Sequence, residues 1–451
     1  VDIKIPIREG PKFRLARIDF VGNEYTRDKI MRREVKTAPG GYVDRRRLDQ
    51  GLAAIRRLNY FDRSTLRIDD AIGPGGETIE GWKRATYELV EGRTGNVTFG
   101  VALSTNGGFG ASVNFSKRNF DIARWPTSLD DITSGRAWTG AGQEFDLLIN
   151  PGTEVTQFRA RFREPRFFGS KFSFETSVYK RLAFREDYRT DRLGYTVGIG
   201  YPLLQRDDNT MALFGEVTWR HELVDIDDID PDAVPGVFLF SEENELRSLT
   251  GSLSLVTRND SIKPTFETRS SLAAEYAGGF LGGDLEFWKV TGRTSATWVV
   301  HEDEDGKKHR VAARLSAGIS EAFGSTPEVP PYERYYAGGR TFRGFEFRGV
   351  GPHVNGEPIG GEFLLLGSLE YEFPIVARTL SLVVFTDQGT LGTSLSDDDA
   401  FRWRISVGAG LRFAIPFLTG NRPMALDFGF PIYSEDEDEE GIFSFSLGRD
   451  L

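Results

Sequence analysis

The residues best suited to chemistry gather in one stretch, which runs from Tyr332 to Pro352. Four arginines lie there among Tyr and Phe residues, namely Arg334, Arg340, Arg343 and Arg348. Five glycines interrupt the stretch, so it cannot form the interior of a regular helix or strand. Its aromatic content indicates order, and a guanidinium buried among aromatic rings needs carboxylates beside it. The stretch therefore predicts a long, ordered and functional loop, with an ordered surface loop of no function as the alternative.

Candidates for catalysis and metal binding are few. The chain has four histidines and no cysteine, and no two histidines have the spacing of metal ligands on a helix. A lipase within a barrel would need a serine, a histidine and a polar orienting group on one strand face. His221 is the only candidate histidine, and it has no evident partner. The sequence therefore predicts no enzyme activity, no metal site and no cofactor.

Composition and charge narrow the fold class. The 451 residues include 51 glycines and 12% aromatic residues, which favours many strands joined by tight turns over helices. The net charge of −11 is uneven, because residues 1–92 carry 19 Lys and Arg against 15 Asp and Glu, whereas the remainder carries 37 against 52. This contrast predicts a boundary near residue 92. The small, scattered basic excess gives no support for nucleic-acid binding.

Residues 11–92 predict a small α+β domain. Its expected elements, in order, are a strand over 13–21, helices over 27–35 and 44–58, and strands over 64–68 and 82–90. Thr26 and Asp44 are the expected N-caps of the two helices. Residues 1–10 alternate apolar and polar side chains, and we interpret them as the end of a similar preceding domain.

Residues 93–451 alternate apolar and polar side chains with a period of two, which is typical of strands. The expected strands are 95–104, 108–118, 142–150, 154–164, 171–183, 191–201, 211–223, 245–257, 266–276, 285–300, 309–320, 362–373, 379–387, 402–413, 424–431 and 442–449. Sixteen is an even number, as in bacterial outer-membrane barrels, and closure removes the sheet edges. We therefore predict a 16-stranded antiparallel transmembrane β-barrel. A soluble all-β repeat protein is the alternative.

The connections also alternate, with long ones expected on the outer side and short ones on the side of the small domain. The longest, residues 321–361, contains the arginine-bearing stretch. Residues 121–140 form a long insert on the side of the small domain, where a short turn is expected, and the sequence assigns it no role.

Several motifs resemble the BamA family of outer-membrane assembly proteins. In the loop these are Tyr336-Ala337-Gly338-Gly339, Arg343-Gly344-Phe345 and Gly351-Pro352. The order of elements in residues 11–92, with Arg17 to Asn23 and Asn59 to Asp62, resembles the POTRA domain of that family. The resemblance implies that loop 321–361 folds back into the barrel. It also implies that Arg343 pairs with Glu370 and Asp387 on the following strands. Glu370 shares its strand face with Ser368, and Asp387 shares its face with Val383 and Phe385.

The resemblance further implies a function in the bacterial outer membrane, with the POTRA domain in the periplasm. The protein would fold and insert unfolded outer-membrane β-barrel clients through a lateral seam between the first and last strands, in contact with outer-membrane lipids. The POTRA region would receive accessory lipoproteins and periplasmic chaperones. The expected seam residues are Val97, Phe99, Val101 and Leu103 on the first strand and Phe443, Phe445, Leu447 and Gly448 on the last. A polypeptide secretion pore of the two-partner type and a passive channel are the alternatives, although a plugging loop argues against the channel.

Overall fold

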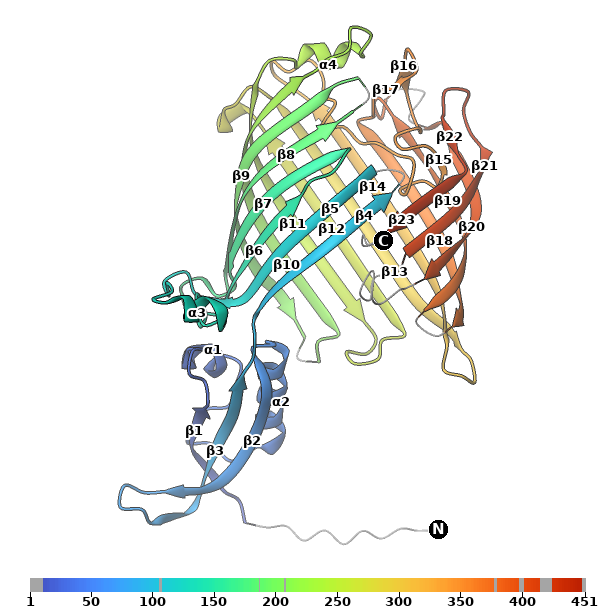
Figure 1. Ribbon diagram of the computed structural model, residues 1–451. Coiled ribbons are helices and arrows are strands. Elements are labelled where there is room, and N and C mark those ends of the chain that lie inside the picture. The colour runs from blue at the N-terminus through green and yellow to red at the C-terminus, as the bar shows by residue number, and fades with distance from the viewer. Residues whose placement is uncertain are drawn as a thin grey trace. The chain divides into compact units, whose positions relative to one another are not determined.

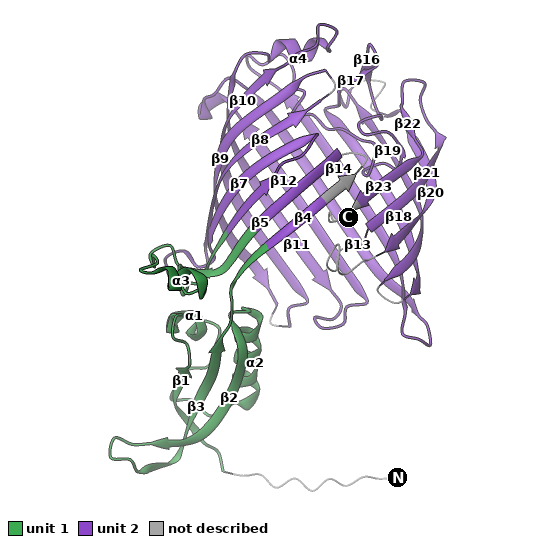
Figure 2. Cartoon of the chain, in the orientation of Figure 1, with its two compact units in different colours: residues 1–97, 115–145 green, residues 98–114, 146–451 purple. Residues whose placement is uncertain are grey.

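The computed structural model describes residues 11–104, 108–185, 187–206, 208–376, 379–396, 401–413 and 424–447. The chain divides into two compact units, residues 1–97 with 115–145 and residues 98–114 with 146–451 (Figure 2). No helix in the described ranges is both long enough and apolar enough to cross a membrane. The strand expected within residues 1–10 lies outside the described residues.

The first unit contains a three-stranded sheet with two helices (Figure 1). Its elements are β1 (Arg14–Val21), α1 (Asp28–Arg32), α2 (Arg45–Arg57), β2 (Phe61–Ile72) and β3 (Thr78–Glu91). The strand order is β1-β3-β2, with β1 parallel and β2 antiparallel to β3. The strand-helix-helix-strand-strand order is the one that the sequence predicts.

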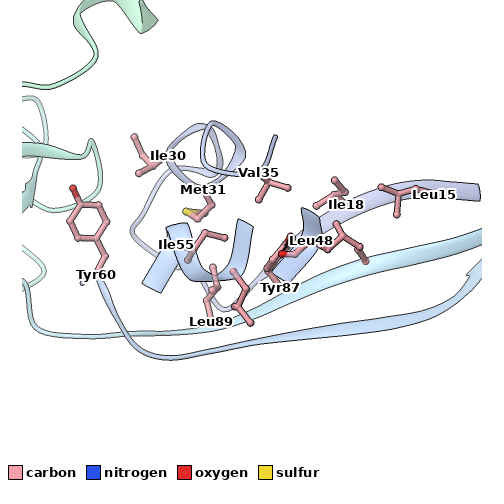
Figure 3. Close-up of a cluster of buried hydrophobic side chains, with 12 residues drawn as sticks. Leu15, Ile18, Ile30, Met31, Val35, Leu48, Ile55, Tyr60, Tyr87 and Leu89 are labelled. Atoms are coloured by element: carbon pink, nitrogen blue, oxygen red, sulfur yellow. Dashed lines mark hydrogen bonds between the residues drawn. The ribbon is translucent and has the colours of Figure 1, made fainter. Parts of the chain in front are cut away.

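The core of this sheet forms where α2 covers it (Figure 3). Leu48, Leu52 and Ile55 recur at helical spacing on α2, so they share one face and are buried together. Tyr87 on β3 is fully buried and donates a hydrogen bond of 2.9 Å to the carbonyl of Leu48. Asp44 caps α2 as expected, because its carboxylate accepts from the Arg47 N–H at 3.2 Å.

The expected cap of the first helix is wrong. Helix α1 begins at Asp28 after Arg27, and no side chain caps it. The Thr26 hydroxyl instead accepts a hydrogen bond of 2.8 Å from the Asn119 side chain. The helix ends at Arg32, earlier than the expected end at residue 35.

The insert after β5 belongs to the first unit, together with the three-stranded sheet. It carries the short helix α3 (Leu129–Thr133), whose N-cap Ser128 forms a capping box with Asp131. Two further bonds tie the insert to the start of α1, because the Arg27 N–H donates to the Gly140 carbonyl at 3.0 Å and the Arg27 guanidinium contacts Asp121 at 2.5 Å. The insert therefore packs as an ordered part of this unit.

The remaining strands form a closed antiparallel ring of sixteen, which confirms the predicted barrel (Figure 1). They are β4 (Gly95–Ser104), β5 (Gly108–Phe120), β6 (Gln143–Asn150), β7 (Val155–Glu164), β8 (Ser173–Phe184), β9 (Arg189–Gln205), β10 (Met211–Asp227), β11 (Asn244–Arg258), β12 (Phe266–Ala277), β13 (Phe287–Glu302), β14 (Lys308–Ala322), β18 (Phe363–Val376), β19 (Leu380–Gly392), β20 (Arg404–Phe413), β21 (Met424–Tyr433) and β23 (Phe443–Leu447). Short elements lie in the connections, namely η1 (Phe167–Gly169), α4 (Pro235–Leu239), η2 (Gly279–Leu281), β15 (Gly344–Phe345), β16 (His353–Val354), β17 (Glu357–Pro358) and β22 (Glu440–Gly441).

The two faces of the wall differ along β18 and β19. Leu382 and Val384 are exposed on the outer face, whereas Val383, Phe385 and Asp387 on the other face are almost fully buried. An apolar patch on the inward face of a barrel strand needs something to cover it, because water would otherwise contact it. The connection between β14 and β18 provides this cover.

Candidate functional site

The connection between β14 and β18, called the lumen loop below, lies inside the ring. It contacts inward-facing residues of β9, β10 and β13 as well as residues of β18 and β19. Its side chains form an apolar cluster with the wall. The cluster consists of Tyr335, Ala337, Phe342, Phe345 and Val350 from the loop with Leu364, Leu366 and Leu391 from β18 and β19. Burial of these side chains keeps the loop compact without long regular structure.

Arg343 lies at the centre of the loop and contacts both expected carboxylates. Its Nε and Nη2 atoms donate to the two carboxylate oxygens of Asp387, each at 2.8 Å. Nη1 donates to Glu370 at 2.8 Å, and Nη2 donates to the Ser368 hydroxyl at 3.2 Å. The guanidinium carbon lies 3.4 Å from the ring centre of Phe385, which adds a cation–π contact. A planar fork held on two edges and one face has a single defined position.

The Arg343 side chain is only 7% exposed. Burial by itself would lower the pKa of Arg343, but Asp387 and Glu370 outweigh it and hold the pKa above its usual value. Arg343 is therefore a fixed positive charge inside the barrel.

A second arginine extends this ion cluster. Arg412 on β20 donates to Asp427 on β21 at 2.7 Å and to Glu370 at 3.4 Å. Asp427 lies 3.9 Å from Arg343, so two arginines and three carboxylates form one connected network across β18 to β21. The sequence motif reveals only the Arg343 part of this network, because Arg412 and Asp427 stand in ordinary strand alternation.

The glycines of the loop motif allow close backbone approach. Gly338, Gly339 and Gly344 all have positive φ angles, of +124°, +57° and +97°. A Cβ atom on Gly338 would lie 2.1 Å from the Glu346 carbonyl oxygen. A Cβ atom on Gly344 would lie 3.1 Å from Ser406, so any larger residue would push the motif away from the wall.

The loop motif also pairs with the segment just before the last strand. Gly344 and Phe345 form β15, which pairs antiparallel with Gly441 and Glu440 of β22. β22 is followed at once by β23, the last strand of the ring. The Arg343 motif is therefore paired with the segment that leads directly into the strand that closes the barrel.

The opposite end of the loop carries a second ionic anchor, which the sequence analysis missed. Glu333 accepts from Arg192 of β9 at 2.5 Å and from Arg220 of β10 at 3.2 Å. Lys289 of β13 donates to the Glu333 carbonyl at 2.5 Å. Burial alone would raise the pKa of Glu333, but Arg220, Arg192 and Lys289 outweigh it and lower the pKa strongly.

The loop is thus attached to two separate groups of wall strands by charges of opposite sign. Arg343 is a loop cation held by wall carboxylates, and Glu333 is a loop carboxylate held by wall cations. Arg192 and Arg220 stand out in the sequence only as charged side chains on predicted strands. Their partner lies more than a hundred residues away, so spacing could not identify it.

The expected seam residues lie on β4 and β23. Val97, Phe99 and Val101 are exposed, with Phe99 exposed by 75%. Phe443 and Phe445 pair with β21 on the other side of β23. The described ladder between β23 and β4 consists of Ser446 opposite Ser104 and Leu447 opposite Leu103. Gly448 lies outside the described residues.

A closed ring of sixteen antiparallel strands with a tethered inner loop, together with a small strand-helix-helix-strand-strand domain, defines a class. This class is the outer-membrane type of transmembrane β-barrel that carries a POTRA domain. The family model described as the Omp85 superfamily domain matches residues 138–451, and the model described as surface antigen variable number repeat (POTRA) matches residues 13–91. The chain belongs to the Omp85 superfamily.

Individual relatives agree with this assignment. The outer membrane protein assembly factor BamA of Nitratidesulfovibrio vulgaris is 26% identical over 100% of this chain and 53% of its own length. BamA of Neisseria meningitidis serogroup B is 25% identical over 99% of this chain and 58% of its own length. The chain therefore spans little more than half the length of these relatives. The resemblance to the BamA family that the loop motif indicates is confirmed.

Solved structures share the fold. BamA from Haemophilus ducreyi lacking POTRA domains 1–3 superposes with a TM-score of 0.74 at 18% identity, covering 97% of this chain and 84% of that one. CdiB from Acinetobacter baumannii superposes with a TM-score of 0.62 at 13% identity, covering 97% of this chain and 74% of that one.

Proposed function

We propose that this protein folds client β-barrel proteins and inserts them into the bacterial outer membrane through the seam between β23 and β4. The observation that carries the proposal is the link between the lumen loop and the closing strand, because β15 of the Arg343 motif pairs with β22 immediately before β23. β4 and β23 are the first and last strands of the ring, so no turn joins them and they can separate while the rest of the ring stays connected.

Opening would expose the backbone edge of β4, to which a client strand can add by main-chain hydrogen bonds. The exposed outer side chains of β4, such as Phe99, would face outer-membrane lipids beside the incoming strand. No covalent step is required, so the proposal assigns no enzyme activity.

The lumen loop fits this mechanism as a control element. Arg343 fixes the loop to β18 and β19, and β15 pairs with β22 immediately before β23. The loop would therefore hold the closing strand in place while it is docked. Loss of the docked state would free β22 and allow β23 to move away from β4.

In this proposal the POTRA domain lies in the periplasm. Its strand β2 is an edge of the three-stranded sheet and can accept an added strand from a partner, whereas the other edge strand, β1, already exchanges backbone hydrogen bonds with Gly40 and Gly41 through Leu15. Clients, periplasmic chaperones and accessory lipoproteins are the proposed partners. The names of the BamA relatives, which call them assembly factors, support this assignment.

A disulfide across the seam tests the proposal, since the chain has no native cysteine. The variant Ser104→Cys/Ser446→Cys joins residues that face each other in the ladder. The matched control is Thr257→Cys/Thr268→Cys between β11 and β12, where the two hydroxyls lie 2.6 Å apart. In vesicles with an unfolded barrel client, we expect the oxidised seam variant to lose insertion and to regain it on reduction, while the control inserts in both states. Full insertion by the oxidised seam variant would refute the lateral route.

The second candidate is a polypeptide secretion pore, which the shared fold with CdiB structures favours. Such a pore passes its substrate through the lumen, so it would need the loop to leave while the seam stays closed. The same variant separates the two functions. A seam-locked barrel that still passes an unfolded polypeptide across the vesicle membrane would establish the pore.

A further inference from the structure

The lumen loop leaves a cavity of ≈ 930 Å³ beside it, within the second compact unit. Nine Lys and Arg side chains line this cavity, against three Asp and Glu side chains. The chain as a whole has the opposite balance, with a net charge of −11. The positive lining is therefore a local feature of the cavity and does not follow from the composition of the protein.

The three acidic residues are already used. Asp387, Glu370 and Asp427 all belong to the network of Arg343 and Arg412 described above. Arg334 is also paired, at 2.8 Å from Glu328. These carboxylates therefore pair with Arg343 and Arg412, and Glu328 pairs with Arg334.

Four arginines of the lining are not paired with any carboxylate that the structure describes. They are Arg181 on β8, Arg185 just after β8, Arg293 on β13 and Arg314 on β14. Over the described part of the chain, none of the four forms an ion pair with an acidic side chain. We call the part of the cavity that they line the arginine chamber.

Arg185 illustrates the local excess of positive charge. Its guanidinium donates to the Phe184 carbonyl at 3.0 Å and lies 5.8 Å from the ring centre of Phe347 in the loop. Burial, followed by the nearby guanidinium of Arg348, lowers the pKa of Arg185 to about 10. A bound anion would relieve this repulsion, since an opposite charge nearby favours the charged form of a buried group.

We propose that the arginine chamber binds a small multivalent oxyanion of the polyphosphate type, taken up from the water of the lumen. Guanidinium groups bind phosphoryl oxygens through two parallel hydrogen bonds, so a cavity lined by four of them suits a ligand with several charged oxygens. The cavity is large enough for such a ligand together with its water. The cavity is also lined by Ser444, Phe445 and Ser446 of β23, but anion binding by the four arginines does not require client insertion, so the proposal stands whether or not the protein inserts clients.

The test uses inorganic pyrophosphate as the probe and isothermal titration calorimetry on the full chain in detergent micelles. The test variant is Arg181→Gln/Arg293→Gln/Arg314→Gln, and the matched control is Arg206→Gln, whose exposed side chain lies in the turn after β9. We expect saturable binding to the wild type that weakens as salt is added. The triple variant should bind at least roughly tenfold more weakly, and the control should match the wild type.

A difference in gel mobility between heated and unheated samples shows whether the triple variant is folded. If it is not folded, the single variants Arg293→Gln and Arg314→Gln provide the test. Each should bind pyrophosphate more weakly than the wild type. Absence of pyrophosphate binding to the wild type would overturn the proposal. Equal binding by the wild type and by the folded arginine variants would overturn it as well, since the binding would then lie elsewhere.

Discussion

Removing the guanidinium of Arg343 should release the lumen loop from the wall. In the variant Arg343→Ala the four side-chain hydrogen bonds to Asp387, Glu370 and Ser368 are lost. The Asp387 and Glu370 side chains are only 4% and 12% exposed, so both would remain as buried negative charges. Breaking a buried ion pair from one side costs about 3–5 kcal/mol.

Two remaining contacts bring the expected cost toward the lower end of that range. The backbone N–H of residue 343 donates to Asp387 at 3.0 Å and is unaffected by the substitution. Arg412 stays 3.4 Å from Glu370 and compensates part of its charge. We therefore expect a loss of about 3 kcal/mol in the free energy that favours the docked loop, or a factor on the order of 10² in its population.

A double-mutant cycle in lipid vesicles measures this quantity, with urea unfolding followed by tryptophan fluorescence. The loss in free energy of unfolding for Arg343→Ala/Asp387→Asn should be about 2 kcal/mol smaller than the summed losses of the two single variants. The reason is that the double variant no longer buries an unpaired Asp387 charge. The control is Glu346→Gln, an exposed loop residue two positions before Arg348, which should change stability by less than about 0.5 kcal/mol. Strict additivity of the Arg343 and Asp387 effects would refute the reasoning.

Three further perturbations follow from the same contacts. Glu333→Gln leaves Arg192 and Arg220 partly unpaired, so it should destabilise the barrel by about 2–4 kcal/mol in the same urea assay. An unchanged urea midpoint of unfolding would show that the second anchor contributes nothing to stability. Gly344→Ala should lower the free energy of unfolding by about 1–3 kcal/mol, because φ is +97° and the added Cβ atom would lie 3.1 Å from Ser406. The control Gly251→Ala, in open space on β11, should lower it by less than about 1 kcal/mol. Equal effects of the two substitutions would contradict the role of Gly344. Tyr87→Phe removes the hydrogen bond to the Leu48 carbonyl and should destabilise the POTRA domain by about 0.5–1.5 kcal/mol, measured by amide hydrogen exchange of α2 in the full chain; exchange as slow as in the wild type would contradict this.

The strands of the barrel were predictable because their signal is local. Alternation along each strand depends on neighbouring residues only, and it located all sixteen strands, with ends that differ by a few residues. Helix α2 was equally predictable, since its apolar spacing and its cap at Asp44 lie within fifteen residues. Helix α1 was less so, because Thr26 is engaged by Asn119, which is distant in the sequence.

The site was predictable only where a motif marks it. The resemblance implied the pairing of Arg343 with Glu370 and Asp387, and the structure places the three groups in direct contact. Nothing in the sequence indicates that Glu333 contacts Arg192 and Arg220, because this pairing depends on how the loop folds across the lumen. Val383 and Phe385, which the sequence already placed on the face of Asp387, are buried on the inward side of β19, where a face is ordinarily polar unless a loop covers it.

The central claim is that the segment from Tyr332 to Pro352 is held inside the barrel. Amide hydrogen exchange of the wild-type protein in vesicles tests it most directly, because the N–H groups of Tyr335, Gly339, Arg343, Glu346 and Val350 all donate hydrogen bonds. These amides should exchange as slowly as those of the flanking strands β14 and β18. Exchange across this segment at the rate of an unstructured peptide would show that the loop is not held there, and the account of the anchors and of seam control would be contradicted.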